Sequence, residues 1–144
     1  MKKHFKKVMI SFFSLAFILT FTSTFKVNAA TGSWHNTTIS GCQVRVWTDY
    51  SRYTSSATSI DTYAETNGKC GTIDYKAAIY VTGEGRVSSV QSGYFANRTP
   101  IKYFYFSNMP NINRGFNIVE SHFELYKNGS FIGAASSDTL IVDR

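Results

Sequence analysis

Apolar and polar residues alternate at every second position in segment after segment beyond residue 30, and this alternation constrains the fold more than any other feature. The segments recur every ten to fifteen residues and are bounded by Gly, Asn, Ser and Pro. No window of eleven or more residues there carries apolar side chains at helical spacing. A period of two places successive side chains on opposite faces of a strand. The sequence therefore predicts an all-β fold.

The number of alternating segments predicts a small antiparallel two-sheet sandwich, Ig-like or jelly-roll-like, with about eight or nine strands. A small β-barrel is the alternative architecture. No linker or repeat divides the segments, so residues 30–144 are expected to form a single domain. The expected strands are 34–39, 42–48, 58–66, 69–81, 87–92, 101–106, 116–126, 130–135 and 139–142.

Residues 1–29 have the composition of a secretory signal peptide. Four lysines precede an uncharged stretch at 8–25 that is rich in Phe, Leu and Ile, and Val27 and Ala29 suit the pockets of a signal peptidase. We expect cleavage after Ala29, a secreted domain at 30–144 and no membrane span in the mature chain. An uncleaved anchor is the alternative, because the uncharged stretch just reaches the length that crosses a bilayer.

The positive charge of the chain is concentrated in that leader. Fifteen Lys and Arg residues stand against nine Asp and Glu residues, but five of the cations lie within the first 30 residues. The remainder carries ten cations and nine anions, a net charge of about +1. Nucleic-acid binding needs a face of cations that neutralises phosphates. Nucleic acid is therefore not an expected partner of the mature domain.

Cys42 and Cys70 are the two cysteines of the chain. An oxidising exterior favours their pairing, and no third cysteine competes, so the sequence predicts a disulfide between them. The layout of a lysine-rich leader followed by a small β domain with one disulfide resembles many exported proteins of Gram-positive bacteria. That resemblance describes a class and transfers no site residues.

Two Asn-Gly dipeptides, at 67–68 and 128–129, predict type I′ hairpins, because both central residues of that turn need positive φ. Counting back from the first turn places Asp61 directly opposite Asp74, with Glu65 further along the same face. The other face of that hairpin is expected to be core, with Ile60, Thr62, Ala64, Ile73, Tyr75, Ala77, Ile79 and Val81. In the second hairpin the same counting pairs Leu125 with Ile132 and Phe123 with Ala134.

Opposed carboxylates on neighbouring strands repel and need compensation. One reading is a Ca²⁺ site formed by Asp61, Asp74 and Glu65, since Ca²⁺ prefers oxygen ligands. A second is an acid/base pair of a small secreted hydrolase that uses Asp61 and Asp74. A third is that Lys76, diagonal to Asp61, neutralises the pair without further function. A bulge at the turn would remove the juxtaposition. No other cofactor is expected.

Aromatic residues supply the second candidate site. Trp47, Tyr50, Arg52 and Tyr53 surround a Ser- and Thr-rich loop, and such loops at sandwich ends often carry recognition. In the run 101–106, Ile101, Tyr103 and Tyr105 share one face of a strand, while Lys102, Phe104 and Phe106 share the other. Either both sheets cover this strand or one aromatic face is exposed. Exposed tyrosines suit stacking on sugar rings, and they can also simply rim the sandwich.

The function expected from these features is that of a secreted, non-enzymatic binding module, because no nucleophile elbow or other catalytic constellation is visible. The expected partner is a cell-wall or extracellular polysaccharide, or a protein, bound through the loop of Trp47, Tyr50, Arg52 and Tyr53. The hydrolase that uses Asp61 and Asp74 is one alternative. A secreted toxin or antimicrobial protein is another, although a net charge near +1 weakens attraction to anionic lipid.

Overall fold

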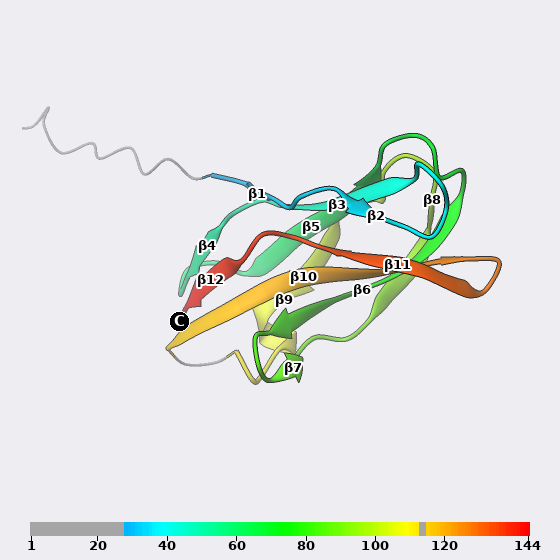
Figure 1. Ribbon diagram of the computed structural model, residues 1–144. Helices are drawn as coiled ribbons and strands as arrows, with labels where there is room; N and C mark the ends of the chain where they lie inside the picture. Colours follow the sequence, from blue (N-terminus) through cyan, green and yellow to red (C-terminus); the bar gives the residue numbers. More distant parts are fainter. Residues whose placement is uncertain (1–27, 113–114) are drawn as a thin grey trace, which may run out of the picture.

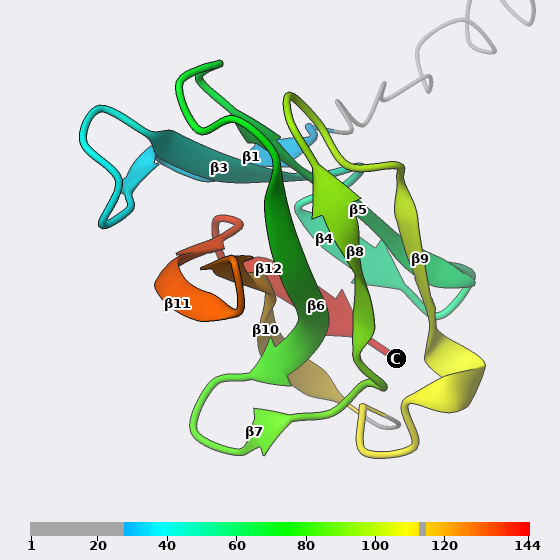
Figure 2. The same cartoon turned by 90° about the vertical axis from the view of Figure 1, so that its right-hand side faces the viewer.

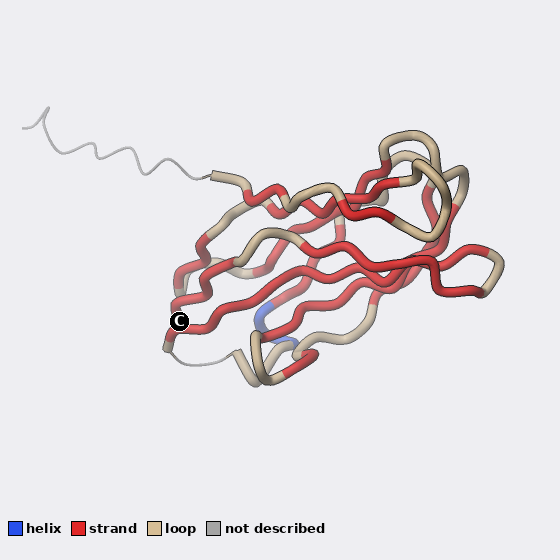
Figure 3. The backbone as a smooth tube through the Cα atoms, in the orientation of Figure 1, coloured by secondary structure: helices blue, strands red, loops and turns tan. Residues whose placement is uncertain are grey.

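The computed structural model describes residues 28–112 and 115–144 as two β-sheets packed face to face (Figure 1). The predicted leader, except for its last two residues, lies outside the described residues. Within the described ranges the secondary structure consists of twelve strands and one short 3₁₀ helix, η1 (Phe106–Asn108), as the tube in Figure 3 shows. The predicted all-β, two-sheet architecture is confirmed.

The first sheet has five strands in antiparallel pairing. Its order is β1-β3-β5-β9, and β2 pairs with the start of β3. β9 is therefore an edge strand, with one face directed away from the core. The five strands are β1 (Ala30–Thr31), β2 (His35–Asn36), β3 (Gln43–Thr48), β5 (Ser59–Thr66) and β9 (Lys102–Tyr105).

The second sheet has seven strands and is organised around the long strand β10. β10 pairs with β6 along one side, and along the other it pairs first with β12 and then with β11. β7 and β8 both pair with β6, as Figure 2 shows, and β4 joins β12 in parallel. The strands are β4 (Arg52–Thr54), β6 (Ile73–Val81), β7 (Gly85–Arg86), β8 (Gln91–Phe95), β10 (Phe116–Lys127), β11 (Ser130–Ser136) and β12 (Leu140–Asp143).

The expected strand at 87–92 is displaced to β8, which begins only at Gln91. The reason lies in the hydrogen bonds of Ile79. Its carbonyl still accepts the Val87 N–H at 2.9 Å, but its own N–H donates to the Ser88 hydroxyl at 2.9 Å instead of to a strand carbonyl, so the segment from Ser88 to Val90 leaves the ladder. The strands that alternation did not predict, β1, β4 and β7, are two or three residues long, too short to show a period of two.

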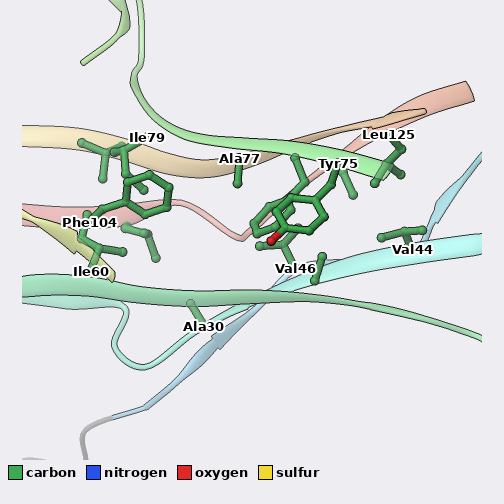
Figure 4. Packing of buried hydrophobic residues seen from close by; sticks show 14 of the residues in the cluster. Ala30, Val44, Val46, Ile60, Tyr75, Ala77, Ile79, Phe104 and Leu125 are labelled. Carbon is green, nitrogen blue, oxygen red and sulfur yellow. The ribbon is translucent and has the colours of Figure 1, made fainter. Parts of the chain in front are cut away.

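The core lies between the two sheets (Figure 4). Side chains of the seven-stranded sheet, such as Tyr75 and Leu125, face side chains of the five-stranded sheet, such as Val46 and Phe104. All eight residues expected to form the core face of the first hairpin are buried. The hydroxyls of Thr62 and Ser121 bond each other across the core at 2.9 Å, so these two buried polar groups satisfy one another.

The first predicted hairpin is wrong, although its burial pattern is right. β5 and β6 do not pair; they belong to different sheets and face each other across the core. A type I′ turn needs positive φ at both central residues, and Gly68 has it (φ 82°) while Asn67 does not. Asn67 instead donates its backbone N–H to Gln43 and its side-chain amide to Gly41. The dipeptide therefore ends the five-stranded sheet and sends the chain to the other one.

The second Asn-Gly dipeptide forms the predicted hairpin, because Asn128 (φ 51°) and Gly129 (φ 78°) both have positive φ. Lys127 pairs with Ser130 and Tyr126 with Phe131, as expected. A bulge after these pairs shifts the register by one residue, so Leu125 pairs with Gly133 and Phe123 with Ala135. The predicted pairs with Ile132 and Ala134 are wrong, and Ala135 takes the buried place expected for Ala134.

The predicted disulfide between Cys42 and Cys70 is present. It joins the turn before β3 to the segment between β5 and β6, so it fastens the five-stranded sheet to the start of the seven-stranded one. Both cysteines are buried. No helix within residues 28–112 or 115–144 is long and apolar enough to cross a membrane.

Candidate binding face

The four residues of the predicted aromatic loop do not form one surface. Tyr53 is 1% exposed and lies in the core against Phe106, so it cannot contact a partner. Tyr50 is exposed and packs edge-on against the Tyr53 ring. Arg52 is bound to Asp143 at 2.7 Å. Trp47 lies on β3, with its side chain on the outer side of the five-stranded sheet.

Tyr53 has a structural role that sequence reasoning missed. Its hydroxyl donates to Asp49 Oδ1 at 2.6 Å, and the same oxygen accepts the backbone N–H of Asp61 at 3.2 Å. Desolvation raises the pKa of Asp49 above its usual value, against the opposing effect of the Tyr53 hydrogen bond. Desolvation and the carboxylate also raise the pKa of Tyr53, so it stays protonated and donates. This contact ties the loop after β3 to β5.

The outer surface of the five-stranded sheet carries aromatic rings in stacked pairs, one between two strands and one along a single strand. Trp47 on β3 is paired directly with Tyr63 on β5, and the two rings stack with centroids 4.9 Å apart. Tyr103 and Tyr105 on the edge strand β9 stack on each other at 6.4 Å. We call this surface the aromatic face and define it by Trp34, Arg45, Trp47, Tyr63, Arg98, Tyr103 and Tyr105.

Two arginines hold rings of the aromatic face in place. The Arg45 guanidinium lies 4.5 Å from the centre of the Trp34 ring, and that of Arg98 lies 5.0 Å from the Tyr63 ring. Arg45 also forms an ion pair with Glu65, which faces it across the β3–β5 ladder. Each ring is thereby oriented before any partner arrives.

The alternation in the run 101–106 is confirmed. Phe104 and Phe106 are buried, whereas Tyr103 (47% exposed) and Tyr105 (50%) point outward. Tyr105 lies between two grooves of about 380 and 480 Å³. Half of the residues that line them are serine, threonine, asparagine or glutamine, with hydroxyl or amide side chains. These residues are Ser55, Ser56, Thr58, Ser88, Ser89, Gln91, Ser107 and Asn108, and Arg144 adds a cation to the larger groove.

The three carboxylates predicted as a Ca²⁺ site are separated. Asp61 pairs with Tyr103 in one sheet, and Asp74 pairs with Tyr94 and Tyr126 in the other. Glu65 is engaged by Arg45. No group of three or more His, Cys, Asp or Glu residues in the described part of the chain could hold a metal ion. The register that suggested both the cation site and the acid/base pair is absent, because β5 and β6 lie in different sheets.

Sequence reasoning missed Trp34, Arg45, Tyr63 and Arg98 as members of the aromatic face. For Arg45 and Tyr63 the signal was present in the alternation, since 43, 45 and 47 share one face of a strand and 61, 63 and 65 share one face of the next, whereas Trp34 and Arg98 lie outside these strands. The Asn-Gly dipeptide at 67–68 predicts that β5 pairs with β6, and that prediction conceals the pairing of β3 with β5. A face of oriented rings beside polar grooves can stack on the C–H surfaces of sugar rings while hydroxyls and amides bind the sugar hydroxyls.

Comparison with known proteins agrees with the sandwich architecture. The family model described as the YqgA MG2 macroglobulin domain matches residues 27–143. A macroglobulin-like domain is an Ig-like β-sandwich, the first of the predicted alternatives. The cell wall-binding protein YqgA of Bacillus subtilis (strain 168) is 52% identical over 87 residues, which cover 59% of this chain and 61% of that relative. The chain thus matches about three fifths of the relative's length. No solved structure matches significantly.

Proposed function

This chain belongs to the family of YqgA MG2 macroglobulin domains, and from that premise we propose that it is an extracellular binding module that attaches to the cell-wall polysaccharide of a Gram-positive bacterium through its aromatic face. The name of the relative supports the wall as the partner. The placement of the rings supports the surface.

The observation that carries the proposal is the exposed, oriented rows of rings on the five-stranded sheet. Trp34 is 40% exposed, and Tyr103 and Tyr105 are about half exposed, yet each is fixed by an arginine or by a neighbouring ring. Rigid rings lose little conformational entropy when a ligand binds. The grooves on both sides of Tyr105 extend this surface with hydroxyl and amide groups that suit a glycan more than an apolar protein segment.

The test is retention of the purified protein on insoluble Gram-positive cell walls, with the triple variant Trp34→Ala, Tyr103→Ala, Tyr105→Ala. We expect at least about a tenfold loss of affinity, equivalent to about 1.4 kcal/mol, because three ring contacts are removed. The matched control is Tyr94→Ala with Phe131→Ala, which removes two exposed rings from the seven-stranded sheet.

The control variant is expected to bind walls like the wild type. Wild-type retention of the triple variant would reject the aromatic face as the attachment surface. Binding to walls stripped of polysaccharide, or to a purified extracellular protein but not to walls, would reject the polysaccharide as the partner. Unfolding curves of both variants separate loss of binding from loss of fold.

Export is part of the proposal and has its own test. Ala30 is buried at the start of β1 and pairs with Thr48, so a chain that begins there keeps the strand. Expression in a Gram-positive host should yield protein in the wall and medium fractions whose first residue is Ala30. A cytosolic protein that retains residues 1–29 and has reduced Cys42 and Cys70 would contradict export.

A further inference from the structure

The outer face of the seven-stranded sheet has a hollow of about 330 Å³ that the attachment surface does not include. It is lined by side chains of β6, β7 and β10 and of the segment before β8. We call it the polar hollow and define it by Lys76, Ala78, Tyr80, Arg86, Val90, His122 and Glu124. Its volume is at the lower end of the range for small-ligand sites, which suits a fragment of about two residues.

The hollow exists because Ala78 has a small side chain between two large ones. Lys76, Ala78 and Tyr80 alternate along the outer side of β6, and Ala78 is paired with His122 on β10. On the other side of β6 the segment from Ser88 to Val90 has left the ladder, as the bond from Ile79 to Ser88 shows, and Val90 forms a wall. The floor is thus apolar and the rim is charged.

One end of the hollow carries a single cation, and the other end carries a cation beside a carboxylate. Arg86 is paired with Tyr80 at one end, and Lys76 is paired with Glu124 at the other. The two ends are four residues apart along β6, about 13 Å at the usual rise of a strand. Arg86 makes no ion pair among the described residues, and its guanidinium suits bidentate binding of a carboxylate.

Other rim groups already have fixed orientations. His122 Nδ1 is bonded to the Ser136 hydroxyl at 2.9 Å, and the His122 ring packs edge-on against Tyr80. Glu124 Oε2 accepts the Tyr126 hydroxyl at 2.7 Å, which leaves Oε1 for a further donor. Lys76 Nζ lies 4.9 Å from the centre of the Tyr126 ring. These contacts give the hollow a prearranged acceptor and a prearranged cation.

We propose that the polar hollow binds the carboxylate end of a short peptide with a small apolar terminal side chain. Arg86 binds the terminal carboxylate, and Ala78 and Val90 contact the side chain. Glu124 accepts the N–H of the preceding amide, and Lys76 donates to its carbonyl. Glu124 beside the cations disfavours a dianion such as phosphate, and the apolar floor disfavours a sugar acid, whose hydroxyls it would leave unpaired.

The experiment measures binding of N-acetyl-alanyl-alanine, in its L,L and D,D forms, to the full chain by NMR and calorimetry. At least one form with a free carboxylate is expected to bind about tenfold or more tightly than its C-terminal amide, and to shift the ring signals of His122. The Arg86→Gln variant should bind acid and amide equally, because the preference resides in that contact. Lys69→Gln is the control, since Lys69 is exposed and outside the hollow.

Equal affinity of acid and amide for the wild type, a preference that survives Arg86→Gln, or no binding of any form would overturn the proposal. Glucuronic acid that binds as tightly as the dipeptide would overturn its peptide part. Ala78→Leu fills the hollow and should abolish binding. If the Ala78→Leu protein fails to fold, the Arg86→Gln variant still decides the test. The triple variant of the aromatic face should bind the dipeptide normally, so failure of wall attachment and failure of this site are distinguishable.

Discussion

The two outer faces of the sandwich arise from the same alternation of residues but differ in what the cross-strand pairs contain. On the five-stranded sheet a large ring faces a large ring, as in Trp47 and Tyr63, and the rings stack. On the seven-stranded sheet a small residue faces an imidazole, as in Ala78 and His122, and a hollow results. Cross-strand pairing, more than composition, thus decides whether a face presents a stacking surface or a cavity.

Removal of the disulfide should have the largest effect and should weaken the five-stranded sheet most. The loop closed by Cys42 and Cys70, with a sequence separation of 28, contains β3 and β5 of that sheet and the three-residue strand β4 of the other. Cys42→Ser with Cys70→Ser is expected to lower the free energy of unfolding by roughly 3 to 4 kcal/mol in the chain-entropy model. Denaturant unfolding measures the loss, and amide exchange should show β3 and β5 opening before β6 and β10.

An unchanged unfolding midpoint for this double variant would contradict the assigned role of the disulfide. Equal loss of protection in both sheets would contradict the expected difference between them.

Two tyrosine-to-carboxylate bonds offer a matched test of the core against the outer face, because Tyr53 on β4 is buried whereas the Tyr126 bond on β10 lies at the surface. Tyr53→Phe leaves the half-buried Asp49 carboxylate without its hydroxyl donor, which should cost about 1 to 3 kcal/mol of stability. Tyr126→Phe removes the bond to Glu124 at the solvent-exposed face and should leave the unfolding free energy unchanged. Equal effects of the two substitutions in denaturant titrations would show that the Tyr53 bond does not support the sheet.

Because the pKa of Asp49 is raised in the folded chain, its contribution to stability depends on pH, and an asparagine at this position lacks that dependence. A carboxyl group whose folded-state pKa is above its unfolded value stabilises the fold below the unfolded value, near 3.8, and loses that contribution as pH rises through the folded-state pKa. Asp49→Asn should therefore gain stability relative to wild type as pH increases from 3 to neutrality, measured by thermal unfolding in parallel. A stability difference that stays constant or falls over that range would contradict the desolvation of Asp49.

The ion pair of Arg45 and Glu65 should have the smallest effect on stability. Both side chains are partly exposed, so solvent screens the pair. Glu65→Gln is expected to change the unfolding free energy by less than about 1 kcal/mol and to leave the Arg45 contact with Trp34 intact. A larger loss in thermal or denaturant unfolding would show that the pair holds β3 to β5.

The sequence predicted which residues are buried better than which strands are neighbours. Ile60 and Ile73 are both in the core, as alternation indicated, but they belong to two different sheets rather than to one hairpin. A period of two reports only that one side of a strand is covered, and the covering layer can belong to either sheet. The dipeptide Asn-Gly forms a hairpin turn at Asn128, whereas at Asn67 it sends the chain to the other sheet. Hydrogen bonds to Gln43 and Gly41 engage Asn67, and its φ is not positive.

The candidate site was predictable only in part. The outward orientation of Tyr103 and Tyr105 follows from alternation alone. Phe104 is buried in the core, so its two neighbours on the strand point to the opposite face. The burial of Tyr53 does not, because β4 is three residues long and its phenol is accommodated by Asp49, a partner that only the folded chain brings near. The polar hollow depends on the register of β6 with β10 and on the displacement of β8, neither of which is encoded locally.

The most direct test of attachment through the aromatic face uses the two tryptophans of the chain, Trp34 and Trp47, which both belong to that face. Their fluorescence therefore reports on this surface alone. We predict that solubilised wall polysaccharide shifts the emission and protects it from acrylamide quenching over the same concentration range in which the polymer binds. Saturating binding of the polymer without any change in tryptophan emission or quenching would contradict the account.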